Sequence, residues 1–273
     1  MVKWLGVLSV VSLQLLACSP NQKASTLQSD SFNTTEQIIN GTPIQDQNSL
    51  PKSVVAVYDA STGQLCSGAL LPNNIVLTAA HCIGYFPEAM YIVFDTEITT
   101  RSTLRSVDKI KISEYWDLQK SGRTDTGDLA LLHYVGTTPL GYVATPLLNS
   151  PGLLRQGTEV ILAGFGVADG KSQDGAGILR MTTVKIADPA FSNTELKLDQ
   201  RSGSGACHGD SGGPAFIKIG EKYFVWGIAS RGAEDEANDC SQFSIYTSAV
   251  YYKTWIERNA KLLSRSLVSR TSL

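Results

Sequence analysis

Short apolar runs recur along most of the chain, and most are too short for helices. Three follow one another early, at Ser53–Tyr58, Gln64–Leu71 and Ile75–Thr78. Between them stand Ser-Thr-Gly and Pro-Asn-Asn, which are turn-forming sequences. Similar runs continue through the second half: Gly157–Ala163, Ile178–Ile186, Ala215–Ile219, Tyr223–Ser230 and Phe243–Thr247. The pattern predicts an all-β domain.

Only the last apolar segment has helical periodicity. Between Ala249 and Leu263, the residues Tyr252, Trp255 and Ile256 lie on helix spacing. The composition, 42% hydrophobic and 18% charged, excludes a disordered chain. A formal net charge of −2, with no basic cluster, argues against nucleic acid or an anionic membrane surface as the main partner.

Residues 1–17 have the features of an export signal. Met1–Lys3 is positively charged and Trp4–Ala17 is apolar, but the apolar run is shorter than a membrane-spanning helix. It ends in Leu-Leu-Ala-Cys, which resembles the lipobox of bacterial lipoproteins, where Cys18 would be lipidated and begin the processed chain. The alternative is an ordinary signal peptide cut near Ala17. The polar segment 18–37 is then a tether or propeptide.

The number of cysteines fits this prediction. The chain has 5, an odd number for an exported protein. If Cys18 carries lipid, four remain, enough for two disulfides in an oxidising compartment. We therefore expect an exported protein of the bacterial cell envelope, or a periplasmic or extracellular one after release.

The strongest chemical signal is Gly-Asp-Ser-Gly-Gly-Pro, which centres on Ser211. A serine needs a base and a stabilised oxyanion to act as a nucleophile, and flanking glycines permit the tight backbone turn that supplies N–H donors. The run also matches the Gly-x-Ser-x-Gly of α/β-hydrolases, but in that fold the histidine follows the serine. His81, His133 and His208 all precede Ser211, which excludes that fold.

Two further motifs complete a His, Asp, Ser order. His81 stands in Leu-Thr-Ala-Ala-His-Cys, and Asp128 begins Asp-Leu-Ala-Leu-Leu. Taken alone, such a histidine is a core residue or metal ligand, such an aspartate a turn cap, and the serine motif a loop. Together, over Ile38–Leu263, they resemble the trypsin-like (chymotrypsin-family) serine proteases.

The resemblance implies an architecture and a reaction. The architecture is two packed six-stranded Greek-key β-barrels with a C-terminal helix and the active site between the barrels, in a peptidase domain at 38–265 followed by a tail at 266–273. The reaction is that of a serine endopeptidase (EC 3.4.21), which passes through an acyl-enzyme. Ser211 would attack the scissile carbonyl, His81 would move the proton, and Asp128 would orient the imidazole. The N–H groups of Gly209 and Ser211 would form the oxyanion hole, and His133 and His208 would be non-catalytic.

Three structural features also follow from the resemblance. The implied disulfides are Cys66–Cys82, beside the catalytic histidine, and Cys207–Cys240, beside the specificity pocket. Cleavage before Ile38 would free an amine that pairs with Asp210 and orders the site. Ile38 and Ile39 could instead simply begin the first strand. Gln37 stands where a trypsin-specific activator would need Lys or Arg, so the activating protease is unknown.

Specificity is inferred from four positions. In the family, Gly205 falls on the pocket floor, Gly232 and Ser244 fall on its walls, and Ser230 is the serine that hydrogen-bonds the triad aspartate. An open, uncharged pocket predicts an uncharged P1 side chain, which is the residue before the scissile bond. Arg231 replaces a bulky aromatic usual in the family. The acidic loop Ala233–Asp239 is either a solvated loop or attracts basic residues near the site.

The expected partners are protein or peptide substrates and an activating protease. No cofactor and no metal is predicted, because Asp95 and Glu97 lack the spacing of a calcium site. Membrane contact would come only through lipid on Cys18, and the chain is expected to be a monomer. Two alternatives remain, an inactive protease-fold binding protein and a lipid-anchored esterase with the same triad.

Overall fold

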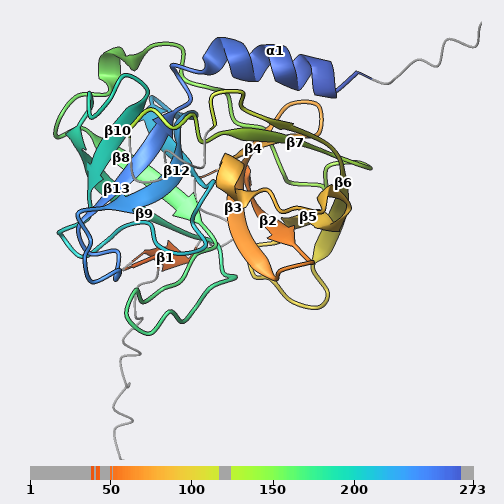
Figure 1. Ribbon diagram of the computed structural model, residues 1–273, viewed down its shortest axis with the longest axis horizontal. Helices are drawn as coiled ribbons and strands as arrows, with labels where there is room; N and C mark the ends of the chain where they lie inside the picture. Colours follow the sequence, from red (N-terminus) through yellow and green to blue (C-terminus); the bar gives the residue numbers. More distant parts are fainter. Residues whose placement is uncertain (1–37, 40, 44–49, 51, 117–123, 266–273) are drawn as a thin grey trace, which may run out of the picture. The chain divides into compact units, whose positions relative to one another are not determined.

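The first half of the folded region forms a closed antiparallel barrel. Its strands follow one another in the order β2-β3-β4-β7-β6-β5 (Figure 1). Their bounds are β2 (Val54–Asp59), β3 (Gln64–Leu71), β4 (Ile75–Thr78), β5 (Met90–Phe94), β6 (Thr103–Ile112) and β7 (Ala130–Tyr134).

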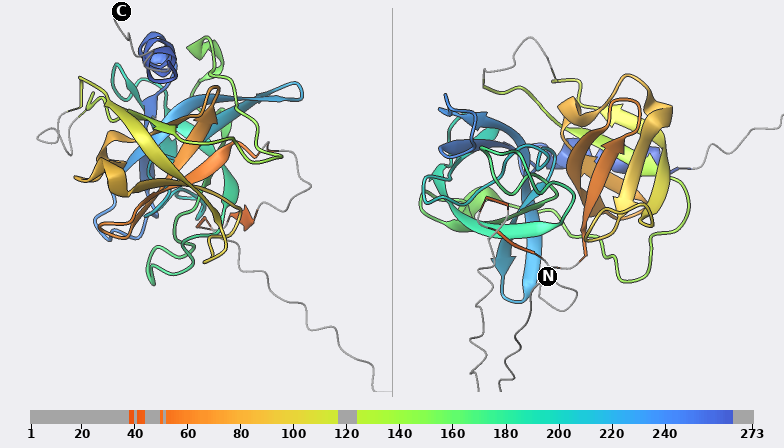
Figure 2. Two further views of the ribbon diagram at one scale, coloured as in Figure 1. Left: turned by 90° about the vertical axis from the view of Figure 1, so that its right-hand side faces the viewer. Right: turned by 90° about the horizontal axis from the view of Figure 1, so that it is seen from below.

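The second half forms another closed six-stranded antiparallel barrel, and the two barrels lie side by side (Figure 2). Its strand order is β8-β9-β10-β13-β12-β11, and β11 pairs back with β8. The short strand β1 (Thr42–Pro43) adds to β9. The other bounds are β8 (Glu159–Gly164), β9 (Arg180–Asp188), β10 (Glu195–Asp199), β11 (Pro214–Ile219), β12 (Lys222–Ala233), β13 (Phe243–Ser248) and the helix α1 (Lys253–Leu263).

This architecture comes from a computed structural model that describes residues 38–39, 41–43, 50, 52–116 and 124–265. The expected export signal at 1–17, the lipidation site Cys18, the tether at 18–37 and the tail at 266–273 lie outside the described residues. Within the described residues, no helix is long and apolar enough to span a bilayer.

The fold class predicted from the sequence is confirmed. The apolar runs before His81 match β2, β3 and β4 closely, whereas β5, β6 and β10 were not predicted from the pattern. Strand β6 explains the difficulty: only Val107 is buried in it, and Arg105, Asp108 and Lys109 interrupt the apolar alternation. Such a strand is kept in place by its pairing with both neighbours in the closed barrel, so its own sequence needs no apolar alternation.

Two buried clusters stabilise the molecule. One fills the first barrel and continues between the barrels to Trp255 and Ile256 of α1. The other fills the second barrel around Trp226 and Tyr246. Helix α1 packs against β6 and β7 of the first barrel, so the end of the chain ties the two barrels together (Figure 1).

Both expected disulfides are present. Cys66 and Cys82 are bonded with Cα atoms 6.1 Å apart, and Cys207 and Cys240 with Cα atoms 5.4 Å apart. The first joins β3 to the turn after β4, and the second joins two loops of the second barrel.

Candidate active site

His81 lies just beyond the buried strand β4, in a one-turn 3-10 helix at Ala80–Cys82. The Cys66–Cys82 disulfide holds the residue that follows it. The side chain of His81 is 26% exposed, so one edge of the ring is accessible while Nδ1 lies 2.7 Å from Asp128 Oδ2. A ring whose Nδ1–H is donated to a carboxylate keeps Nε2 available as a proton acceptor.

Asp128 is buried at the start of the segment that leads into β7, and it accepts hydrogen bonds from both barrels. The backbone N–H of His81 donates to Oδ1 at 3.0 Å, and the imidazole contacts Oδ2. Ser230 Oγ, from β12 in the second barrel, also donates to Oδ2 at 2.6 Å. The carboxylate is therefore fixed in place and orients His81.

Ser211 lies in the loop before β11 and meets the first barrel at the end of β4. Its carbonyl oxygen accepts from Ser67 N at 2.8 Å. A Cβ at Gly212 would lie 2.0 Å from Thr78 Oγ1, and Gly212 has a φ of +77°, so only glycine fits this close approach. This packing places the Ser211 loop against Thr78, three residues before His81 in the chain. Within the described residues, no hydrogen bond joins Ser211 Oγ to His81.

The backbone amides around Ser211 differ in how they are used. The N–H groups of Asp210, Gly212 and Gly213 all donate to carbonyl oxygens within 3.0 Å. Across the part of the chain that is described, the N–H groups of Gly209 and Ser211 donate no hydrogen bond. Gly209 adopts a φ of +93°, a conformation that alternates the directions of successive amides. Two unused donors beside a serine can stabilise an oxyanion.

Asp210 is buried directly behind these amides. Its Oδ1 accepts from Gly166 N at 2.8 Å and its Oδ2 from Cys207 N at 2.9 Å. Burial raises the pKa of Asp210 to about 6, and these two N–H groups and the charge of Arg180 act in the opposite direction. Ile38 is buried as well, yet no hydrogen bond or ion pair among the described residues joins it to Asp210.

A cavity of about 270 Å³ opens beside Ser211. Ser230, Gly232 and Ser244, three of the positions inferred from the sequence, line it. Gly205 does not line it, because the side chain of Gln200 lies against that position, where a Cβ would be 2.1 Å from Gln200 Cδ. The sequence reasoning missed several lining residues: Gln200, Ala206, Asp235, Asn238, Phe243 and Tyr246.

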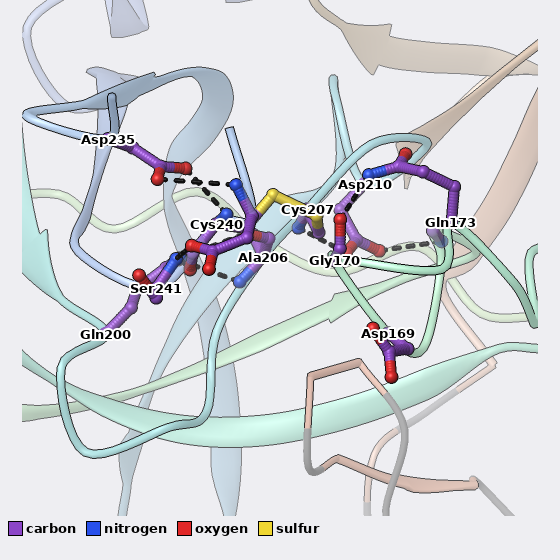
Figure 3. The surroundings of a disulfide bond; sticks show 12 residues. Asp169, Gly170, Gln173, Gln200, Ala206, Cys207, Asp210, Asp235, Cys240 and Ser241 are labelled. Atoms are coloured by element: carbon purple, nitrogen blue, oxygen red, sulfur yellow. Dashed lines mark hydrogen bonds between the residues drawn. A yellow bond between two sulfur atoms is a disulfide. The ribbon is translucent and has the colours of Figure 1, made fainter. Parts of the chain in front are cut away.

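Hydrogen bonds around the Cys207–Cys240 disulfide brace this cavity (Figure 3). Gln200 Oε1 accepts from Ala206 N at 2.8 Å, and Gln200 Nε2 donates to the carbonyl oxygens of Ala206 and Cys240. Asp235 Oδ2 accepts from Cys240 N at 2.6 Å. Part of the acidic loop thus belongs to the pocket wall, with its carboxylate turned to backbone donors.

Arg231, which also lines the cavity, forms an ion pair that no sequence pattern indicated. Its Nη1 and Nη2 donate to Glu195 Oε1 at 2.8 Å and Oε2 at 3.0 Å. Glu195 is buried and accepts further hydrogen bonds from Asp125 N and Thr126 Oγ1. The pair therefore holds the segment that leads to Asp128.

The two remaining histidines lie in different surroundings. His133 Nδ1 lies 2.5 Å from Asp108 Oδ1 on the first barrel, and His208 is exposed and lines the cavity. Within the described residues, two groups of cysteine and histidine stand close enough to share a metal, and each contains one of the disulfides. Oxidised sulfur is not a thiolate ligand, so neither group suits a metal.

Comparison with known proteins agrees with this geometry. Human chymotrypsin-like elastase family member 1 is 27% identical over 82% of this chain and 92% of its own length. The dog protein of that name is 26% identical over the same shares. CLIP domain-containing serine protease B4 of Anopheles gambiae is 23% identical over 82% of this chain and 71% of its own length. The family model Trypsin matches residues 38–256. With this match across both barrels, the chain belongs to the trypsin family of serine endopeptidases.

Proposed function

We propose that the chain hydrolyses peptide bonds through Ser211, His81 and Asp128. The observation that carries this proposal is the position of Asp128, whose carboxylate accepts from His81 of the first barrel and Ser230 of the second. His81 Nε2 takes the proton of Ser211 as Oγ attacks the scissile carbonyl, and returns it to the leaving amine. The N–H groups of Gly209 and Ser211 receive the oxyanion of the tetrahedral intermediate.

Labelling with a fluorophosphonate, together with cleavage of a peptide library, tests the mechanism. Ser211→Ala abolishes labelling and peptide cleavage, whereas Ser172→Ala, at an exposed position, leaves both unchanged. Asp128→Asn lowers kcat by on the order of 10⁴-fold, because the imidazole is then held in the wrong tautomer. Ester turnover without peptide cleavage would instead indicate an esterase, and no labelling at all would indicate an inactive binding protein.

The pocket favours an uncharged P1 side chain. Gly232 leaves its wall open, since a Cβ there would lie no nearer than 4.0 Å to Phe243 O. Gln200 closes the base behind Gly205 with an amide instead of a charge. Medium or large apolar residues at P1 are therefore expected to be cleaved best. Efficient cleavage after Lys or Arg in the library would overturn this assignment.

Activation would occur by cleavage before Ile38, and export by the segment that precedes it. The freed amine of Ile38 would pair with Asp210, whose pKa is raised because burial of its charge is incompletely compensated. Lipid on Cys18 would anchor the precursor to a bacterial envelope, and cleavage would release the protease, because both disulfides lie within the folded domain. N-terminal sequencing and mass spectrometry of membrane and soluble fractions test both steps. An active form that keeps residues 18–37 and its lipid would contradict release.

A further inference from the structure

Ser67 is a buried polar residue inside strand β3 of the first barrel, and its hydroxyl contacts the second barrel. It is 0% exposed, and a buried hydroxyl needs hydrogen-bond partners. Its Oγ accepts from the backbone N–H of Phe165 at 2.9 Å and donates to the carbonyl oxygen of Gly209 at 2.9 Å. Because an N–H group can only donate, the single proton of the hydroxyl is left for Gly209 O.

The carbonyl group of Gly209 belongs to the peptide group that joins Gly209 to Asp210. This peptide group lies between the two unused N–H groups of the site, because the N–H of Gly209 precedes it and the N–H of Ser211 follows it. Its own N–H, on Asp210, donates to Cys207 O at 3.0 Å. The C=O and N–H of a trans peptide group point in opposite directions. Ser67 Oγ and Cys207 O therefore hold the two ends of this peptide group and fix its plane.

The peptide groups on either side are held by backbone donors. The carbonyl oxygen of His208 accepts from Val167 N at 2.8 Å, and that of Asp210 accepts from Gly213 N at 2.8 Å. Each of these peptide groups carries one of the two unused N–H groups, which points away from the bonded carbonyl oxygen. A backbone donor is present whatever the side chain, whereas the donor from Ser67 depends on its hydroxyl.

The surroundings of Ser67 fit its side chain closely. A Cβ at Gly164 would lie 2.9 Å from Ser67 Oγ, and a Cβ at Gly213 would lie 3.1 Å from Ser67 Cβ, so a side chain at either glycine would crowd the serine. The backbone of Ser67 is anchored as well, since its N–H donates to Ser211 O at 2.8 Å and its carbonyl oxygen accepts from Thr78 Oγ1 at 2.8 Å. The hydroxyl is therefore held on a fixed strand beside Gly209.

We propose that Ser67 is a positioning residue for the oxyanion site. Its hydroxyl fixes the peptide group between the N–H groups of Gly209 and Ser211, so that both point at one oxygen atom. Two such donors converge only while the peptide group between them keeps one orientation. The inference rests on the proposed function, in which these two N–H groups receive the oxyanion. Ser67 acts through Gly209 and is not itself a catalytic residue.

A purely structural role for Ser67 predicts a different result. If the hydroxyl only stabilised the contact between the barrels, its loss would lower the fraction of folded molecules, and each folded molecule would cleave at the wild-type rate. Loss of donor orientation instead lowers kcat in every folded molecule. It leaves KM nearly unchanged, because the oxyanion forms only after the substrate is bound. The value of kcat per active site therefore separates the two roles.

The experiment uses the full chain in its active form, as wild type, Ser67→Ala and Ser53→Ala. Ser53 is the matched control, because it directly precedes β2 of the same barrel and is also 0% exposed. Among the described residues its Oγ has no hydrogen-bond partner. Fluorophosphonate labelling to completion counts the molecules with a reactive Ser211. Values of kcat and KM for a peptide substrate are then expressed per labelled molecule.

Ser67→Ala is expected to lower kcat per labelled molecule by about tenfold or more and to change KM by less than about threefold. Ser53→Ala is expected to keep both values near those of wild type. A smaller fall in kcat, a loss carried by KM, or an equal loss of kcat in Ser53→Ala would each overturn the inference. A wild-type chain that neither labels nor cleaves would instead refute the proposed function.

A second measurement applies if Ser67→Ala does not fold. In a crystal structure of the labelled wild-type chain, the phosphoryl oxygen of the adduct on Ser211 takes the place of the oxyanion. The inference requires that this oxygen accepts from the N–H groups of Gly209 and Ser211 while Ser67 Oγ still donates to Gly209 O. A phosphoryl oxygen bound by both N–H groups without the hydrogen bond from Ser67 would overturn the inference. A phosphoryl oxygen bound elsewhere would refute the proposed oxyanion site.

Discussion

Two buried carboxylates of the second barrel are stabilised in opposite ways. Glu195 accepts a bidentate ion pair from Arg231 and hydrogen bonds from the segment at 125–126. Among the described residues, Asp210 forms no ion pair; it accepts hydrogen bonds from two backbone N–H groups, and one of these donors, Gly166, also accepts from Arg180 through its carbonyl oxygen. Burial raises the pKa of Asp210 to about 6.

This contrast separates a fixed part of the molecule from an adjustable one. A carboxylate in direct contact with its cation is a permanent structural support, and here it holds the approach to Asp128. A carboxylate whose compensation is incomplete retains the capacity to bind a further cation. Asp210 directly precedes Ser211, so a new cation there would act on the candidate site itself.

The largest effect is expected from removing one partner of the direct pair. Arg231→Met leaves Glu195 buried and charged without its cation, which should cost about 3–5 kcal/mol of unfolding free energy. The measurement is urea unfolding at neutral pH. Arg231→Met/Glu195→Gln removes both charges and should recover much of the loss. If the single variant is as stable as wild type, Glu195 does not depend on Arg231.

The next effect is a dependence of stability on pH that originates at Asp210. The pKa of Asp210 is about 6 in the folded chain against an ordinary 3.8, so the folded chain binds this proton more tightly than the unfolded chain does. The charged and titratable groups that interact with the Asp210 carboxylate are Arg180 and Tyr246. The stability that the protonated Asp210 contributes to the folded chain is therefore fully present below pH 3.8 and is lost as pH rises through 6. Relative to Asp210→Asn, wild type should lose about 3 kcal/mol of unfolding free energy over that range.

Urea unfolding of wild type and Asp210→Asn at several pH values checks this prediction. Asp174→Asn, at an exposed position, is the control. A stability difference between wild type and Asp210→Asn that does not change with pH would contradict it. If cleavage before Ile38 frees an amine that pairs with Asp210, as proposed, the pH dependence should weaken in the cleaved form, because the amine favours the ionised carboxylate.

A smaller effect is expected from Gly166→Ala. The added methyl group would lie 2.5 Å from Asp210 Cγ and must displace the carboxylate, at a cost of about 1–3 kcal/mol. Fluorophosphonate labelling should fall along with stability, because the loop at 207–211 moves. Gly152→Ala is the matched control, since its nearest neighbour would be 3.7 Å away. Normal labelling of Gly166→Ala would show that the loop does not depend on this contact.

The smallest effect is expected from an exposed arginine–carboxylate pair that is also bidentate, Arg201 and Asp199. Arg201 Nε and Nη2 donate to Asp199 Oδ1 and Oδ2 at 2.9 Å and 2.8 Å, but the arginine side chain is 58% exposed. Water replaces the lost contacts, so Arg201→Met should leave the urea midpoint close to that of wild type. A loss as large as that of Arg231→Met would show that burial is not what separates the two pairs.

Most of the fold could be inferred from the amino-acid sequence, but some strands were easier than others to recognise from their apolar pattern. Strands β2, β3 and β4 are buried over nearly their whole length, so their apolar runs stand out. Strand β6 is mostly half-exposed and charged, and its position depends on pairing with β5 and β7. Local patterns reveal a strand only where burial shapes its composition.

In the candidate site, too, some residues could be recognised from the sequence and others could not. The motifs around His81, Asp128 and Ser211 carry their own signals, because the glycines beside Ser211 are needed for the local backbone geometry. Gln200 carried no such signal, because the sequence does not distinguish a buried glutamine beside Gly205 from a glutamine on the surface.

The amino-acid sequence, with the family resemblance that its motifs carry, was enough to predict the β-rich class, the two disulfide pairs and the order of the three candidate catalytic side chains. Which charges are buried, and which residues compensate them, emerged only from tertiary packing. Arg231 with Glu195, and Arg180 with Asp210, are each separated by about 30 residues or more in the chain. A charged residue is normally exposed, so burial and pairing of this kind become visible only when strands distant in the sequence pack together.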